Sequence, residues 1–312
     1  MSRTIKVDEQ HDGIDRRGFL KCMAWAGTGV LWTVGTAGLT GCALPFGGAP
    51  KVDGFSFVQV SDSHVGFSAD GVNTDVTKTL QQVVDRINGL PQPPALVLHT
   101  GDLTHLAKPD QFDTVAQIMG TIKTGSVFYV PGEHDVIGDK GVAYRKQFSP
   151  KSPDKGWYST DYKGVHFIGL SNIGNELKFG ILGPEQIDWL AKDLKSVNTD
   201  TPIVVFAHVP LYAVYPAWGW TTDDSAQALA LLKPYASVTV LNGHIHQILT
   251  QTEGNITFHI ANSTAFPPHK PGEGQPGAYK LPPGDLLHML GYRTATIVPG
   301  QHELAIVDPT LA

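Results

Sequence analysis

The apolar run from Ala95 to Thr100 is followed directly by Gly101 and Asp102. Because apolar residues fill consecutive positions, the run predicts a strand that is covered on both faces, as in a parallel sheet. Ligands gather at the carboxyl ends of such strands, and Gly101 has no side chain to block a close approach. We therefore expect Asp102 to lie in a ligand site at the edge of a parallel sheet.

Four further stretches combine a strand-like, mainly apolar segment with acidic or histidine residues shortly after it. The segments span residues 55–60, 126–130, 202–207 and 237–241. The polar residues after them are Asp62 and His64, then Glu133, His134 and Asp135, then His208, and finally His244 and His246. Apolar residues recur at helical spacing over 73–88 and 109–123, so we expect helices between the first three strands. Strands that alternate with helices in this way predict an α/β fold.

The pattern changes in the second half of the chain. A hairpin is predicted from two strand-like runs at 157–161 and 165–170, and an amphipathic helix from 184 to 197. Three strands in the tail, expected to close the fold in antiparallel fashion, span 256–260, 294–298 and 303–307. A loop rich in Pro and Gly separates the first two of them, at 267–283. With no internal repeat or linker, we expect one domain over residues 43–312.

Charge and cysteine content exclude two classes of protein. The net charge is −6, and residues 1–42 hold five basic and four acidic side chains, which leaves 18 basic and 25 acidic residues in the remainder. That balance argues against a protein that binds nucleic acid through bulk positive charge. Both cysteines, Cys22 and Cys42, lie near the N-terminus, so the folded body offers no thiolate ligand. A metal bound there must be held by oxygen and imidazole groups.

The N-terminal segment, residues 1–42, resembles a twin-arginine export signal. Arg16 and Arg17 are followed by Phe-Leu-Lys and then by a charge-free stretch over 22–50 that is rich in Gly, Ala and Thr. The alternative is a single membrane anchor over 22–40, which is about long enough to cross a bilayer. The resemblance implies a bacterial protein that passes through the twin-arginine export machinery and works in the periplasm or on the outer face of the membrane.

Residues 39–42 also resemble a lipoprotein cleavage box, in which Cys42 becomes the acylated first residue. An ordinary cleavage site with a nearby cysteine is the alternative. Contact with the membrane is expected only through the signal anchor or through a lipid on Cys42.

The motifs, taken in order, resemble those of the calcineurin-like metallophosphoesterase superfamily, D-x-H, G-D, G-N-H-[DE], H and G-H-x-H. They run from Asp62 to His246. The resemblance implies an α-β-β-α sandwich of two mixed sheets flanked by helices. It also implies hydrolysis of a small phosphodiester or phosphomonoester by a hydroxide that bridges two metal ions.

The same resemblance assigns roles to the motif residues. Asp102 bridges the two ions; Asp62, His64 and His246 bind one of them, and Glu133, His208 and His244 bind the other. Mixed imidazole and carboxylate ligation suits Mn, Fe or Zn, with the pair left open. His134 takes the place of the catalytic histidine, and Asp135 is expected to fix its tautomer by accepting the ring N–H. A structural role for His134 is the alternative.

One position departs from the superfamily pattern, because Glu133 stands where Asn is usual. A third carboxylate lowers the positive charge of the site, and we infer either a preference for monoanionic diesters or the use of a trivalent ion. A third reading is a catalytically silent protein that binds metal or a partner. His105, where purple acid phosphatases have a tyrosine, is expected to be a hydrogen-bonding residue and not a ligand.

Four aromatic residues lie between His208 and His244, in the stretch from Leu211 to Trp220. They could line the mouth of the site and stack on a nucleoside or aryl group. Core packing, or contact with a membrane or a partner, is the alternative.

Overall fold

The computed structural model describes residues 31–35, 38–42, 52–149, 152, 154–175, 178–301 and 303–312. The chain divides into two compact units, residues 1–49 and 50–312. In the first unit, β1 (Leu31–Gly35) and β2 (Gly38–Cys42) form an antiparallel pair. Arg16, Arg17 and Cys22 lie outside the described residues, so the export signal stays a prediction.

The first sheet of the second unit has five strands in the order β15-β14-β3-β4-β5. The parallel strands are β3 (Phe55–Val60), β4 (Val97–His99) and β5 (Val127–Tyr129), and β14 (Arg293–Ile297) and β15 (Ala305–Val307) are added antiparallel. The connections are α2 (Val76–Asn88) and α3 (Pro109–Met119). The side chain of Asp75 caps α2 by accepting the N–H of Lys78, which explains why this helix begins after Asp75. This half of the fold confirms the predicted order of strands and helices.

The second sheet has six strands in the order β12-β13-β11-β10-β7-β6. Its four central strands are parallel and its two edge strands antiparallel. The strands are β6 (Tyr158–Tyr162), β7 (Val165–Gly169), β10 (Ile203–Phe206), β11 (Val238–Asn242), β12 (Leu249–Glu253) and β13 (Ile256–Ile260). The helices after β7 and β10 are α5 (Pro184–Asp193) and α6 (Ser225–Leu232), and the short hairpin β8 (Ile173–Asn175) and β9 (Lys178–Phe179) precedes α5.

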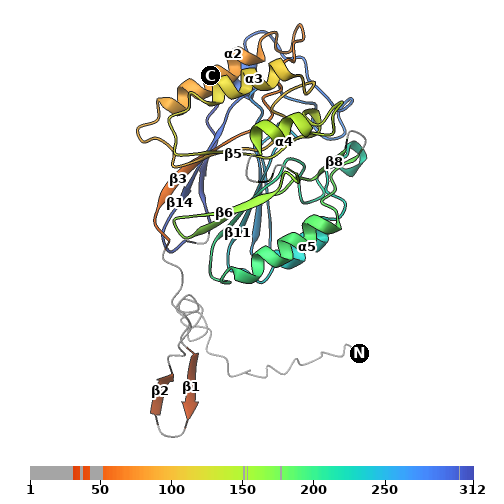
Figure 1. Ribbon diagram of the computed structural model, residues 1–312. Helices are drawn as coiled ribbons and strands as arrows, with labels where there is room; N and C mark the ends of the chain where they lie inside the picture. The colour runs from red at the N-terminus through yellow and green to blue at the C-terminus, as the bar shows by residue number, and fades with distance from the viewer. Residues whose placement is uncertain are drawn as a thin grey trace, which may run out of the picture. The chain divides into compact units, whose positions relative to one another are not determined.

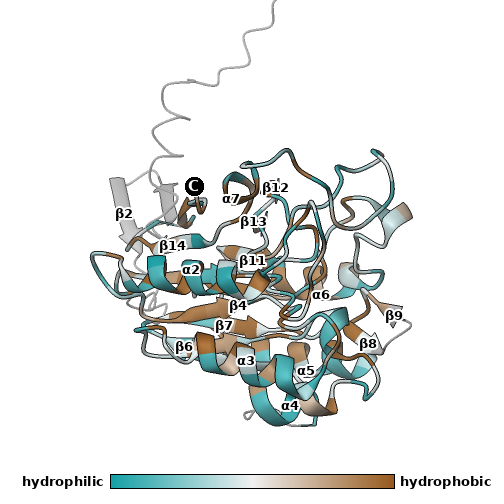
Figure 2. Cartoon of the chain, turned by 90° about the horizontal axis from the view of Figure 1, so that it is seen from above, coloured by the Kyte–Doolittle hydropathy of each residue, from teal (hydrophilic) through white to brown (hydrophobic). Residues whose placement is uncertain are grey.

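The two sheets pack face to face and helices cover their outer faces, as Figure 1 shows with α2 and α3 over one sheet and α5 under the other. The core between the sheets includes Phe57, Leu98, Phe167 and Phe206, all at most 1% exposed. Separate apolar clusters join each sheet to its helices. In Figure 2 the strands are mainly hydrophobic, whereas the helices carry hydrophilic residues on part of their surface. This is the expected α-β-β-α sandwich of two mixed sheets.

Three details differ from the sequence-based expectation. The strand at 256–260 is expected to take part in antiparallel closure, and β13 does pair antiparallel with β12, but its other neighbour, β11, runs parallel to it. Edge strand β12 was not predicted, because its sequence Leu-Thr-Gln-Thr-Glu is mostly polar and exposed. Helices α6 and α4 (Val142–Phe148) were also not predicted, since neither is long enough to show a clear amphipathic repeat.

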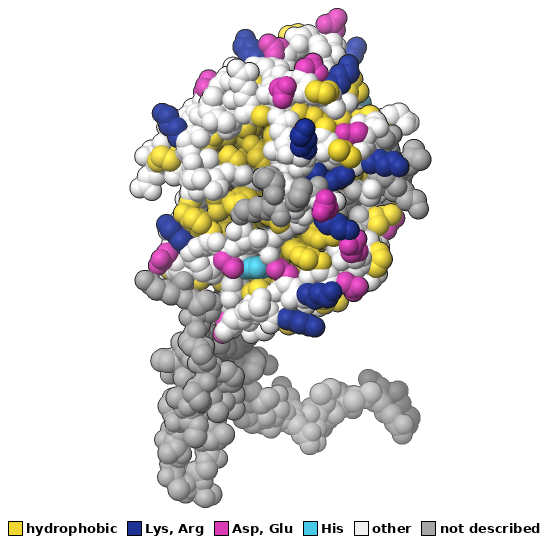
Figure 3. All heavy atoms as spheres, in the orientation of Figure 1, with side chains coloured by type: hydrophobic (Ala, Val, Ile, Leu, Met, Phe, Trp, Pro, Cys, Tyr) yellow, Lys and Arg dark blue, Asp and Glu magenta, His cyan; other side chains and the backbone are white. Residues whose placement is uncertain are grey.

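Charges of both signs are interspersed on the face of the molecule that Figure 3 shows. No single basic patch forms on that face. Within the described part of the chain, no helix combines the length and the hydropathy that a bilayer crossing requires.

Candidate metal centre

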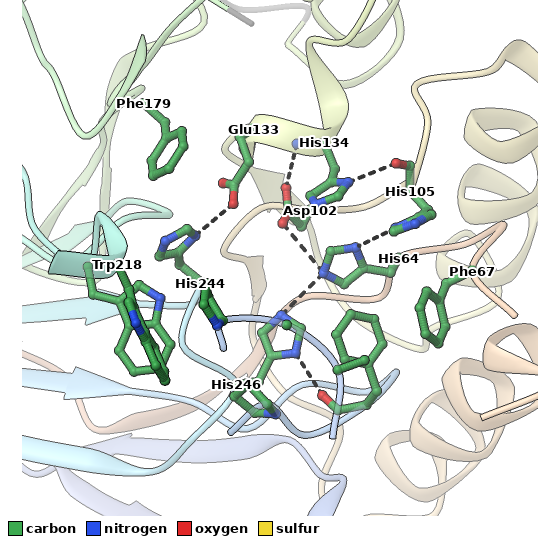
Figure 4. A pocket seen from close by; sticks show the side chains of 16 residues that line it. His64, Phe67, Asp102, His105, Glu133, His134, Phe179, Trp218, His244 and His246 are labelled. Atoms are coloured by element: carbon green, nitrogen blue, oxygen red, sulfur yellow. Dashed lines mark hydrogen bonds and ion pairs between the residues drawn. The ribbon is translucent and has the colours of Figure 1, made fainter. Parts of the chain in front are cut away.

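The predicted site residues converge at one end of the sandwich, at the carboxyl ends of the parallel strands. Among the described residues, five overlapping groups of three form there, and in each of them the ligand atoms lie within 4.8 Å of one another. Two of these groups, which share no residue, are called the first and the second cluster. The first cluster contains Asp62, His64 and His246. The second contains Glu133, His208 and His244. These are the two groups that the motif assignment predicts, and Figure 4 shows most of these side chains around Asp102.

Asp102 lies between the two clusters. Its Oδ2 atom is 3.4 Å from Nε2 of His64 and 3.3 Å from Nε2 of His208. Its Oδ1 atom accepts the backbone N–H of His134 at 2.9 Å. One oxygen atom of Asp102 therefore faces a histidine of each cluster, which is the position that a bridging carboxylate would occupy.

The donor atoms of the second cluster fit a metal ion. Glu133 Oε2, His208 Nε2 and both ring nitrogens of His244 are buried and make no hydrogen bond of good geometry among the described residues, although some of these atoms lie close to one another. Glu133 places its two carboxylate oxygens 2.9 Å from Nε2 of His208 and 2.9 Å from Nδ1 of His244. Buried polar atoms are rarely left unpaired, and carboxylate and imidazole donors in this number suit a divalent transition-metal ion.

Backbone carbonyls fix the orientation of two candidate ligands. Nδ1 of His208 lies 2.7 Å from the carbonyl oxygen of Thr100, and Nδ1 of His246 lies 2.7 Å from that of Phe266. A carbonyl oxygen only accepts, so each Nδ1 carries a proton, and in the neutral ring the lone pair of Nε2 is available to a metal. Neither carbonyl contact was predicted, because main-chain partners leave no signal in the residue types.

The backbone at the site is unusual, since five of the seven candidate ligands have positive φ angles. They are Asp62 at 53°, His64 at 41°, Asp102 at 52°, His244 at 68° and His246 at 53°. Non-glycine residues rarely adopt this left-handed region, and such strain concentrates at functional sites. On an extended segment, residues two positions apart point to the same side, which would pair Asp62 with His64 and His244 with His246. The positive φ angles show that neither segment is extended at these positions. The ligands are presented by tight left-handed turns.

Two glycines leave room for these turns. A Cβ atom on Gly132 would overlap Oδ1 of Asp102, and one on Gly101 would overlap the ring of His208. Gly101 also has a φ of 96°, which glycine adopts at little cost. This confirms the expected close approach at Gly101.

His134 faces the same cavity, but Asp135 does not contact its ring. Nδ1 of His134 donates to the carbonyl oxygen of His105 at 2.8 Å. The buried Asp135 carboxylate instead accepts the backbone N–H groups of Leu103, Thr104 and Gly132 and the Thr104 hydroxyl. The expectation that Asp135 fixes the His134 tautomer is wrong, because its oxygens are occupied by the loop after β4. Asp135 holds that loop against the turn that carries Glu133.

Opposite charges shape the acid–base properties of the centre. Burial alone would lower the pKa of His208, but the Asp102 and Glu133 carboxylates raise that pKa well above its usual value. Burial would raise the pKa of Glu133, whereas His244 and His208 hold it well below its usual range. Burial also opposes protonation of His134, yet Asp102 and Glu133 raise its pKa. The carboxylates therefore favour positive charge at the centre.

A cavity of about 400 Å³ opens beside the two clusters. Its apolar walls are formed by aromatic side chains, namely Phe67, Phe179, Trp218, Trp220 and Phe266. In Figure 4, Phe179 and Trp218 lie on one side of the candidate ligands and Phe67 lies on the other. The Pro- and Gly-rich loop at 267–283 completes the cavity through Pro268, Pro276, Gly277 and Ala278.

The aromatic stretch from Leu211 to Trp220 divides between the two roles considered for it. Trp218 and Trp220 line the cavity, whereas Tyr212 packs on Phe258 of the core with ring centroids 5.0 Å apart.

His105 stacks on His134 with ring centroids 4.8 Å apart, and its Nδ1 lies 3.4 Å from Nδ1 of His64. The sequence did not reveal that Phe67, Phe179 and Phe266 belong to the site, because they lie outside the motifs.

Comparisons with known proteins agree with this architecture. The chain is 26% identical over 220 residues to a 3',5'-cyclic-nucleotide phosphodiesterase of Nostoc, covering 68% of this chain and 79% of that protein. It is 25% identical over 224 residues to the glycerophosphodiester phosphodiesterase GpdQ of Enterobacter lignolyticus, covering 69% and 78%. Among solved structures, a purple acid phosphatase from yellow lupin shares the fold with a TM-score of 0.58 at 18% identity. That match covers 83% of this chain and about half, 52%, of the lupin chain.

The calcineurin-like phosphoesterase family model matches residues 55–248, which carry all seven candidate ligands and His134. Members of this family use divalent metal ions to hydrolyse phosphate esters. The match extends over more than half of the chain and includes the parallel strands β3, β4, β5, β7, β10 and β11. The protein therefore belongs to the calcineurin-like phosphoesterase family, the hydrolases of phosphate esters.

Proposed function

We propose that this protein hydrolyses phosphodiesters with two divalent metal ions, drawn from Mn, Fe and Zn. The observation that carries the proposal is the position of Asp102, whose Oδ2 lies within 3.4 Å of a histidine from each cluster. One ion would be held by Asp62, His64 and His246 and the other by Glu133, His208 and His244, with Asp102 shared. Such a pair supplies an activated water and offsets charge on the attacking and leaving oxygens.

His134 would act on the substrate directly. With its Nδ1 proton held by the His105 carbonyl, Nε2 is the ring atom left for the cavity. Burial opposes a positive charge on His134, but the nearby Asp102 and Glu133 carboxylates raise its pKa, which favours a second proton at Nε2. In this role it donates a hydrogen bond to a phosphoryl oxygen or a proton to the leaving alkoxide.

The charge of the cavity favours a diester over a monoester. Three carboxylates, from Asp62, Asp102 and Glu133, face the two metal positions. Among the described residues that line the cavity, none is Lys or Arg. A monoester dianion would gain less attraction here than in a site with a cationic side chain, whereas a diester carries a single negative charge. The two relatives named above are both phosphodiesterases by name.

The aromatic walls indicate what the ester groups look like. They lie on both sides of the metal positions, so a diester bound between the clusters would direct its two substituents toward them (Figure 4). Planar, weakly polar groups such as a nucleobase or an aryl ring pack well on Trp and Phe. We therefore favour a diester with at least one aromatic substituent.

Turnover assays test the proposal. The metal-free protein is loaded with Mn, Fe or Zn and assayed with bis(p-nitrophenyl) phosphate and with p-nitrophenyl phosphate, beside a His134→Ala variant. We expect metal-dependent hydrolysis that favours the diester and that the variant largely loses. A protein that binds two ions but turns over neither ester would instead be the catalytically silent binding protein that Glu133 also allows.

We further propose export of the protein, on the basis of the sequence alone. Arg16 and Arg17 would direct it through the twin-arginine machinery, and cleavage before Cys42 would release it to the periplasm or anchor it through a lipid. Mass spectrometry of the mature N-terminus tests this proposal. A variant with both arginines changed to lysine is the control, and it should stay in the cytoplasm with residues 1–42 uncleaved. The same result for the wild-type chain would contradict the proposal.

A further inference from the structure

A chain of buried side chains leads from the C-terminal part of the fold to Asp62. Its members are Gln59, Ser61, Thr100 and Arg293, and each of them is 0% exposed. Nη1 of Arg293 lies 3.2 Å from Oε1 of Gln59, and Nε2 of Gln59 lies 3.1 Å from Oγ1 of Thr100. The hydroxyl of Thr100 is 2.6 Å from that of Ser61, which is 2.5 Å from Oδ2 of Asp62.

The directions of the hydrogen bonds in this chain are determined by its two ends, the Arg293 guanidinium and the Asp62 carboxylate. A guanidinium group only donates, so Gln59 must present its carbonyl oxygen to Arg293 and its amide N–H to Thr100. That amide also donates to the carbonyl oxygen of Asn242 at 3.0 Å, which agrees with this orientation. Thr100 accepts from Gln59 and donates to Ser61, and Ser61 donates to Asp62. All the donors therefore point toward the carboxylate.

Arg293 is itself held in place by the carboxylate of Asp308. Its Nε and Nη2 atoms lie 2.7 and 3.0 Å from the two carboxylate oxygens of Asp308, and Nη2 also donates to the carbonyl of Ile260. Such a bidentate pair restricts the guanidinium to one orientation. Arg293 and Asp308 both lie outside residues 55–248, the part of the chain that matches the family.

At the other end, the two oxygens of Asp62 have different partners. Oδ2 accepts the Ser61 hydroxyl, while Oδ1 accepts the backbone N–H of His244 at 3.0 Å and lies 3.3 Å from Nε2 of His246. Oδ1 is thus the atom that faces the first metal position. The hydrogen bond to Oδ2 fixes the rotation of the carboxylate that presents Oδ1.

We propose that the Arg293–Gln59–Thr100–Ser61 chain is a positioning device that sets the metal affinity of the Asp62 cluster from the C-terminal strands. The proposal rests on the metal centre proposed above. Groups that hydrogen-bond to metal ligands commonly change metal affinity by about 10- to 100-fold when they are removed. Loss of one hydroxyl in the chain should therefore weaken binding of one metal ion while the fold persists.

Thr100 offers the sharpest test, because its hydroxyl belongs to the hydrogen-bonded chain whereas its main-chain carbonyl orients His208. Thr100→Val removes the hydroxyl at constant shape and keeps the carbonyl that orients His208, whereas Thr100→Ser keeps both. Thr239→Val is the matched control, since Thr239 is a buried strand residue of β11, 4% exposed, outside the hydrogen-bonded chain. The affinity of the metal-free full chain for Mn and Zn is measured by calorimetry and by competition with a chelator.

We expect Thr100→Val to weaken one of two binding events by about tenfold or more, and Thr100→Ser and Thr239→Val to bind like the wild type. Equal affinity in Thr100→Val and the wild type, with two ions bound, would overturn the proposal while leaving the metal centre intact. A wild-type chain that binds no metal would instead remove the metal centre itself. If Thr100→Val does not fold, Asp308→Asn tests the proposal from the other end of the chain, at a side chain that is 20% exposed. A severalfold loss of affinity for one metal ion would support the proposal, and an unchanged affinity would overturn it.

Discussion

Nδ1 of His134 donates a hydrogen bond of 2.8 Å to the carbonyl oxygen of His105. Since a carbonyl cannot donate, this contact sets the tautomer of His134 without any carboxylate. The ring also stacks on that of His105, with 17° between the planes. The position of this imidazole is therefore determined by the loop after β4.

His134→Ala should lower kcat for diester hydrolysis by about 10²-fold or more, because general acid catalysis typically contributes that much. The content of bound metal should stay at the wild-type value, since the ring of His134 is not assigned to either ion. Steady-state kinetics and elemental analysis of the same preparation check both points. His288→Ala, on helix α7 (Leu286–Met289), serves as the control, and an unchanged kcat for His134→Ala would refute the role.

Glu133→Asn and Glu133→Gln should both raise the rate for a monoester relative to a diester, on the order of tenfold. Each variant removes one negative charge from the second cluster, and Gln keeps the length of Glu while Asn shortens it. The ratio of kcat/KM for p-nitrophenyl phosphate to that for bis(p-nitrophenyl) phosphate is the measurement. A shift with Asn alone would point to side-chain length and not to charge.

Trp218→Leu should raise KM for an aryl diester by roughly 2- to 10-fold, the range expected for loss of one aromatic contact. For a diester with only small alkyl groups, KM should change little. Trp189→Leu, on α5 and away from the cavity, is the matched control. Equal KM changes for the aryl and alkyl esters would show that Trp218 does not select the substituent.

Removal of the metal ions should lower the melting temperature of the protein. Asp62, Asp102 and Glu133 are anionic groups packed close together, and bound cations that prefer the folded state stabilise it. Calorimetry before and after treatment with a chelator, with Mn or Zn added back, measures the effect. A melting temperature that is indifferent to both treatments would argue against occupied sites in the purified protein.

The free energy of unfolding should also depend on pH through His166, which is not one of the candidate metal ligands. Both ring nitrogens of His166 are paired, with Asp161 at 2.7 Å and with Asp193 at 2.9 Å. Burial lowers the pKa of His166, but these two hydrogen bonds and the charges of both carboxylates outweigh it and raise the pKa.

The folded chain therefore binds a proton at His166 more tightly than the unfolded chain, whose histidines have a pKa of about 6.5. The stabilisation is fully present below that pH and is lost as the pH rises through the higher pKa of the folded state. Urea unfolding at several pH values should show this loss in the wild type and a smaller one in His166→Gln. An identical pH dependence in both proteins would exclude His166 as its source.

The residue order alone determined the strands that end in acids and histidines and the α/β class, and the resemblance of those motifs to the superfamily selected the seven candidate ligands. Those features are local, because an apolar run and the polar residue after it lie within a few positions of each other. The partner of His134, the direction of β13 and the division of the aromatic stretch were decided only by tertiary structure. They depend on main-chain carbonyls, left-handed turns and neighbours that are distant along the chain, and none of these can be inferred from the residue types. The path from Arg293 to Asp62 is of the same kind, since it crosses 231 positions of sequence through side chains that meet only when β14 pairs with β3.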